Sequence, residues 1–184
     1  IYWINTELLS SSVNKIYKRG LITELYPENM SFGEDLVFVL NYLKHCNRIS
    51  FTQEPLYQHE VYNSVSLTHS FSPARFSNLE DIQKAILDFA DDKNKINPRI
   101  YDKYVKDALH LTRMWYKNKN VPYIRKKEII GEWLKQSYIR KLKISDYQLH
   151  WKDRMLLHCL HMSCFIGINL IVNGKEYINS LSKE

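Results

Sequence analysis

The clearest helix pattern in the chain lies in residues 31–43, whose sequence is SFGEDLVFVLNYL. Ser31 is followed three residues later by Glu34, which matches a capping box, a pair of side chains that satisfies free N–H groups at a helix start. Apolar residues then recur at helical spacing, at Leu36, Val39, Leu40 and Leu43. The pattern predicts a helix that begins near Ser31 and buries one face.

Short apolar runs flank this helix on both sides. They predict strands or extended segments at Val13–Tyr17, Ile49–Phe51 and Leu56–His59, because turn-forming residues bound each run. Strands that alternate with a helix favour an α/β to α+β fold for residues 1–72.

Helical periodicity dominates from residue 73 to the end, so we expect a mainly helical region at 73–184. A second capping box, Ser77 with Glu80, predicts the first helix of this region. Further helices are predicted around 101–115 and from Pro122 to Tyr138. The stretch Met155–Val172 has 13 hydrophobic residues out of 18, but polar residues interrupt it. It therefore predicts a core helix or one lying on a membrane surface, in preference to a membrane span.

The composition is that of a globular protein. The chain has 184 residues, of which 45% are hydrophobic and 25% charged, enough to bury a sizeable core. Its three cysteines, Cys46, Cys159 and Cys164, include no C-x-x-C pair, which argues against structural zinc or a disulfide framework and favours a reducing compartment. No signal peptide is visible at the abrupt start, so we expect that an upstream segment precedes residue 1.

The net charge of +6 is concentrated in one segment. Residues 117–154 contain eleven Lys or Arg and only four Asp or Glu. This asymmetry predicts an anionic partner for the segment, such as a membrane surface, a nucleic acid or a phosphorylated lipid. A membrane surface fits the two basic clusters of this segment, at Arg125–Lys127 and Arg140–Lys143. We do not expect nucleic-acid binding, because the nearby aromatic residues fall at core-like helical spacing and no known nucleic-acid motif is present.

Two adjacent acids, Glu34 and Asp35, stand at the start of the first predicted helix. A structural explanation is that acidic side chains interact favourably with the positive end of the helix dipole. A functional explanation is that a carboxylate held on a rigid element can accept a proton from an attacking hydroxyl. The local pattern leaves both explanations open.

An ordered series of short motifs surrounds these acids. The series is SVNKIYKR at 12–19, YPEN at 26–29, GEDLVF at 33–38, PLYQH at 55–59 and NSVS at 63–66. In this order it resembles the C-terminal half of bacterial family-2 glycosyltransferases of the GT-A type, which build capsules and exopolysaccharides. The resemblance covers about residues 1–70.

The resemblance implies a GT-A fold and an inverting transfer of sugar from a nucleotide-sugar donor to a glycan or lipid-linked acceptor. It implies that Asp35 is the catalytic base with Glu34 beside it, and that Asn14, Lys15 and Gly33 contribute to substrate binding. It also implies a divalent cation, Mg²⁺ or Mn²⁺, for which His59 is a candidate ligand. The expected location is the cytoplasm, peripheral at the inner face of the plasma membrane.

The chain departs from the family pattern in one respect that matters for activity. It contains no Asp-x-Asp motif, with which the family holds its metal and nucleotide. We therefore expect that the donor-binding half lies outside these residues and that they are inactive alone. The alternative is a non-catalytic, basic helical module that docks to a membrane surface or a protein partner.

Overall fold

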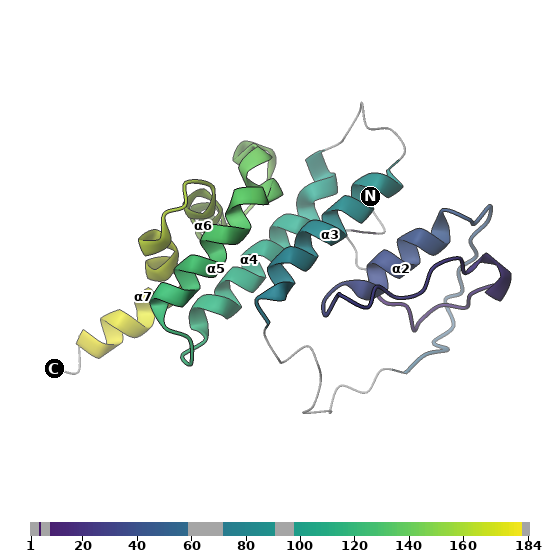
Figure 1. Ribbon diagram of the computed structural model, residues 1–184, viewed down its shortest axis with the longest axis horizontal. Helices are drawn as coiled ribbons and strands as arrows, with labels where there is room; N and C mark the ends of the chain where they lie inside the picture. The colour runs from purple at the N-terminus through teal and green to yellow at the C-terminus, as the bar shows by residue number, and fades with distance from the viewer. Residues whose placement is uncertain (1–3, 5–7, 59–71, 91–97, 182–184) are drawn as a thin grey trace. The chain divides into compact units, whose positions relative to one another are not determined.

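The structure is a computed structural model that describes residues 4, 8–58, 72–90 and 98–181 (Figure 1). These residues form an all-α structure, since none of them lies in a β-strand. The α/β to α+β prediction, and with it the GT-A fold that the resemblance implies, is therefore wrong. The helices are α2 Glu34–Leu43, α3 Ala74–Phe89, α4 Asp102–Lys117, α5 Tyr123–Gln136, α6 Trp151–His161 and α7 Phe165–Leu181.

The described residues of the three predicted strands form no strand, and their apolar residues belong to no sheet. Residues 13–17 and 49–51 are irregular, and so is the described part of the third segment, 56–58. Several apolar side chains there are exposed to solvent, among them Ile16, Phe51 and Leu56. A strand satisfies its backbone by pairing with a neighbour, and short apolar runs do not by themselves specify one.

The helix starts also differ from the prediction. The N-cap of α2 is Gly33, with no side-chain cap bond, so Ser31 is not the cap. Helix α3 begins at Ala74, and the Ser77 hydroxyl donates 2.7 Å to the Ala74 carbonyl within its first turn. Both capping boxes are therefore wrong. Ser77 lies inside α3, where its hydroxyl bonds to a preceding carbonyl instead of capping the helix.

The predictions for the later helices are partly confirmed. Helices α4 and α5 lie where the periodicity places them. The apolar stretch Met155–Val172 is divided between α6 and α7, so the prediction of one helix is wrong. No helix in the described ranges has both the length and the apolarity that crossing a membrane requires.

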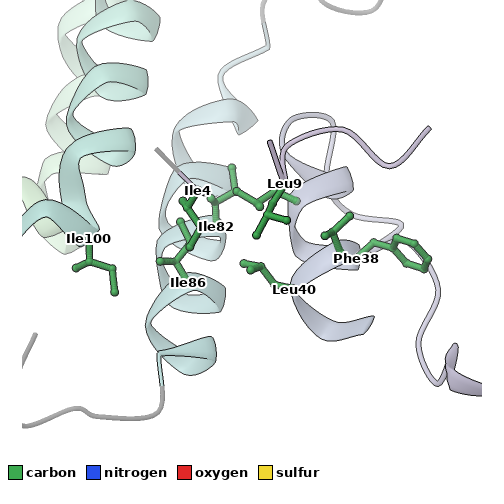
Figure 2. Close-up of a cluster of buried hydrophobic side chains, with 9 residues drawn as sticks. Ile4, Leu9, Phe38, Leu40, Ile82, Ile86 and Ile100 are labelled. Carbon is green, nitrogen blue, oxygen red and sulfur yellow. The ribbon is translucent and has the colours of Figure 1, made fainter. Parts of the chain in front are cut away.

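The chain divides into two compact units, residues 1–103 and 104–184. In the first unit, α2 packs against α3. Figure 2 shows Ile82 and Ile86 of α3 turned toward Leu40 of α2 and toward Leu9. Phe38 points away from α3 in the same view, and the ring of Tyr26 stacks on it with centroids 4.4 Å apart. Helix α2 is thus covered on two sides by residues distant in sequence.

In the second unit, a buried lysine joins α4 to α5. The Lys126 ammonium donates a hydrogen bond to the carbonyl of Tyr116, with a nitrogen–oxygen distance of 2.7 Å. The Trp115 indole N–H donates a hydrogen bond of 3.3 Å to the carbonyl of Lys126. Burial lowers the pKa of Lys126. One residue of the basic segment therefore satisfies a carbonyl at the end of α4 instead of facing solvent. The indoles of Trp115 and Trp133 are buried, as the predicted core spacing requires.

The turn between α6 and α7 is a Schellman motif. The N–H of Cys164 donates a 2.7 Å hydrogen bond to the carbonyl of Cys159, and the N–H of Ser163 donates a 3.0 Å hydrogen bond to the carbonyl of Leu160. Ser163 has φ 54°, in the left-handed region that this motif needs and that usually holds glycine. Helix α7 approaches α6 closely, since a Cβ added at Gly167 would lie 2.7 Å from the Cys159 sulfur.

We expect Ser163→Gly to stabilise the protein by about 0.5–1 kcal/mol, because the left-handed conformation costs a non-glycine residue about 1–2 kcal/mol. The substitution also removes the exposed hydrogen bond from Arg140 to the Ser163 hydroxyl. Ser163→Ala is the matched control, because it loses the same bond and keeps the strain. The free energy of unfolding measured in urea should be highest for Ser163→Gly, intermediate for the wild type and lowest for Ser163→Ala. A glycine variant less stable than the wild type would contradict the prediction.

Candidate functional site

The Asp35 carboxylate is held in place by one residue of the preceding loop. The Ser12 hydroxyl donates a hydrogen bond to Oδ1, with an oxygen–oxygen distance of 2.7 Å. The Ser12 backbone N–H donates a second hydrogen bond to Oδ2, with a nitrogen–oxygen distance of 3.3 Å. Ser12 is buried, whereas Asp35 is half-buried in the first turn of α2. The carboxylate is therefore oriented from one side by Ser12, in a residue that is not fully buried.

The loop that carries Ser12 runs along α2. At its other end, the backbone N–H of Lys18 donates 2.8 Å to the hydroxyl of Tyr42 in the last turn of α2. Between these points the ring of Tyr17 lies edge-on to Phe38 and Tyr42, with centroids 5.3 and 4.9 Å apart. Residues 12–18 and α2 therefore form one local structure, although 23 residues separate Ser12 from Asp35.

Lys15 brings a positive charge close to Asp35. Its ammonium donates to the carbonyls of Leu8 and Ser11 and, at 2.7 Å, to the Asn14 side chain. Burial lowers the pKa of Lys15, and the nearby Asp35 carboxylate opposes that shift. Of the predicted site residues, Lys15 thus interacts electrostatically with Asp35 and contacts Asn14 directly. The lysine also fixes the bend of the loop.

Tyr17 completes this group. Its hydroxyl donates 3.0 Å to the carbonyl of Ser12. The pKa of Tyr17 is raised well above its usual range, first by burial and then by Tyr26, Asp35 and Tyr42. The phenol therefore stays protonated at neutral pH and continues to hold the backbone at Ser12.

Gly33 and Glu34 flank Asp35 at the helix start. Gly33 has φ 76°, and a Cβ at this position would collide with the side chain of Ile82 in α3. The structure thus gives Gly33 a packing role, and its predicted contribution to substrate binding stays a prediction. Glu34 is the half-buried first residue of α2, and its predicted place beside the base also stays a prediction.

The divalent cation finds no matching ligand set here. Within the part of the chain that the structure describes, no three His, Cys, Asp or Glu side chains gather in a way that could hold a metal ion. His59, the predicted ligand, lies outside the described residues. The divalent cation therefore stays a prediction, and we assign none of the described residues to it.

Two residues of the site, Ser12 and Tyr17, are absent from the residues predicted from sequence. Both belong to the motif SVNKIYKR at 12–19. Only the tertiary structure reveals that Ser12 orients Asp35 and that the Tyr17 hydroxyl donates a hydrogen bond to the Ser12 carbonyl. A serine in a loop carries no such information by itself.

Comparison of the chain with protein-family models, with curated proteins and with solved structures finds no match.

Proposed function

We propose that this chain supplies the acceptor-side carboxylate of a glycosyltransferase, with Asp35 as the proton acceptor. The donor is a nucleotide sugar and the acceptor is a hydroxyl of a glycan or a lipid-linked glycan. The reaction takes place in the cytoplasm, at the inner face of the membrane. The proposal concerns the chemistry at Asp35 and does not depend on a GT-A fold.

One observation carries the proposal: two of the motifs that bear the resemblance meet in space. The motif at 12–19 contributes Ser12 and Lys15, and the motif at 33–38 contributes Asp35, which Ser12 holds by two hydrogen bonds. A carboxylate fixed in this way is suited to general base catalysis, because little reorganisation is needed when the proton moves. A carboxylate that only interacts with the helix dipole needs no such partner.

The step assigned to Asp35 is a proton transfer coupled to single displacement. The acceptor hydroxyl gives its proton to a carboxylate oxygen of Asp35 while its own oxygen forms a bond to the anomeric carbon of the donor. The bond from that carbon to the phosphate oxygen breaks, and the nucleoside diphosphate leaves with the electron pair.

The missing Asp-x-Asp motif supports a donor-binding partner for this site. The family holds its metal and nucleotide with that motif, and residues 1–184 do not contain it. We propose that the nucleotide is bound by a polypeptide segment outside these residues.

The proposal is tested by calorimetry on this chain, followed by a transfer assay on the full product of its gene. We expect no binding of UDP-, GDP- or dTDP-sugars to residues 1–184 with Mn²⁺ present. We expect the full gene product to release nucleoside diphosphate from one of these donors only when an acceptor glycan is added. Tight donor binding by residues 1–184 would contradict the placement of the donor site. Failure of the whole donor panel to support acceptor-dependent release would overturn the glycosyltransferase proposal.

A further inference from the structure

Helix α6 has an unusual outer face. Its inner face is buried through Leu156, Leu157 and Leu160. The opposite positions follow a spacing of four, three and four residues, which places them on one stripe, and they are Trp151, Met155, His158 and Met162. Three of these four are large apolar residues, with exposed fractions of 59% for Trp151, 47% for Met155 and 74% for Met162. The outer stripe of a helix on a protein surface is normally charged or polar.

The neighbouring helix α7 also carries exposed apolar side chains. Helices α6 and α7 pack against each other within the second unit (Figure 1). Ile168 of α7 is buried, whereas Ile166 and Leu170, one turn apart, have exposed fractions of 71% and 57%. The α6–α7 pair therefore exposes five large apolar side chains, to which we refer as the apolar face: Trp151, Met155, Met162, Ile166 and Leu170.

Cations border the apolar face. Lys152 lies over the Trp151 ring, 5.3 Å from its centroid, and Lys127 lies 5.7 Å from that of Phe165 in the first turn of α7. Arg140 donates 2.9 Å to the hydroxyl of Ser163 in the turn between the helices. Arg154 is exposed on α6. The acid within α6, Asp153, is ion-paired with Arg113 of α4, so the border is positively charged.

We propose that the apolar face binds an anionic lipid surface, with the α6–α7 pair lying in the headgroup region. Apolar and aromatic residues bordered by Lys and Arg are the pattern of helices that lie in the membrane interface. Trp prefers this depth because its ring is apolar and its N–H is polar. Each bordering cation adds attraction to anionic headgroups.

Charge favours lipid over a second copy of the chain as the occupant. Two copies that met through this face would bring Lys127, Arg140, Lys152 and Arg154 of each close to the same cations of the other, and like charges repel. An anionic bilayer instead neutralises all four. The inference is independent of the function proposed for Asp35, since it rests on residues of 104–184 alone.

The test is flotation of the full 184-residue chain with vesicles of phosphatidylcholine alone or mixed with phosphatidylglycerol. We expect binding to the mixed vesicles, weakened by salt, together with a blue shift of the emission of Trp151 that is lost in Trp151→Phe. Lys152→Gln with Arg154→Gln should weaken binding about 25-fold at low salt, at about fivefold for each charge. Ile166→Gln with Leu170→Gln should weaken it at least about tenfold.

Matched control substitutions lie on α5, where Lys135 and Ile124 are also exposed. Lys135→Gln and Ile124→Gln should change vesicle binding little. The proposal is overturned if the chain does not bind mixed vesicles, or if the α5 variants weaken binding as much as those of the apolar face. It is also overturned if the chain forms a dimer without lipid and Ile166→Gln with Leu170→Gln abolishes that dimer, because the face would then join two copies.

Discussion

Asp35→Asn should lower kcat for sugar transfer by the full gene product about 10²- to 10⁴-fold, the usual contribution of a positioned general base. The amide cannot take the proton of the acceptor hydroxyl. Its Oδ1 can still accept the hydrogen bond that Ser12 donates to Asp35 at 2.7 Å, so the loop should keep its place on α2. The measurement is the steady-state rate of acceptor-dependent nucleoside diphosphate release, with thermal unfolding of the same sample.

Glu54→Gln is the control for this experiment. Glu54 is an exposed acid of the segment that follows α2 and lies outside the motifs of the resemblance, and its change removes one negative charge without touching the site. We expect a kcat close to that of the wild type. If Asp35→Asn also turned over at a near-normal rate while folded, Asp35 would not be the base. If both variants lost activity equally, the cause would be the loss of a negative charge and not the loss of a proton acceptor.

Gly33→Ala should destabilise the protein by at least about 2 kcal/mol, for two separate reasons. The backbone at Gly33 has φ 76°, a conformation that costs an L-residue about 1–2 kcal/mol. The new methyl group would also meet Ile82, whose Cγ1 lies 2.7 Å from the position of the added Cβ. Overpacking of a core adds about 1–3 kcal/mol, and urea unfolding monitored by circular dichroism measures the sum.

Gly20→Ala is the matched control, because no atom lies within 4 Å of a Cβ added at that position. We expect its midpoint in urea to stay close to that of the wild type. An equal loss of stability in both variants would mean that the approach of α2 to α3 is not the cause. A stable Gly33→Ala protein would show that Ile82 can move aside and that the left-handed turn is not required.

The helices were predictable wherever apolar residues recur over several turns. Helices α4 and α5 carry this pattern, and the structure places them accordingly. The break between α6 and α7 was not predictable from hydropathy, because apolar residues continue across it. The left-handed conformation of Ser163 ends α6 there. A serine does not predict such a turn, whereas a glycine at the end of a helix does.

The local sequence around 33–38 determined that a helix starts beside two acids, and the order of the motifs led to Asp35 as a candidate base. Only tertiary contacts decided the rest. The apolar runs at 49–51 and 56–58 form no strands because strand formation needs a partner that no short run contains. Ser12 orients Asp35 only because a loop 23 residues earlier in the chain lies on α2, and such a contact depends on packing between segments rather than on the order of residues within either.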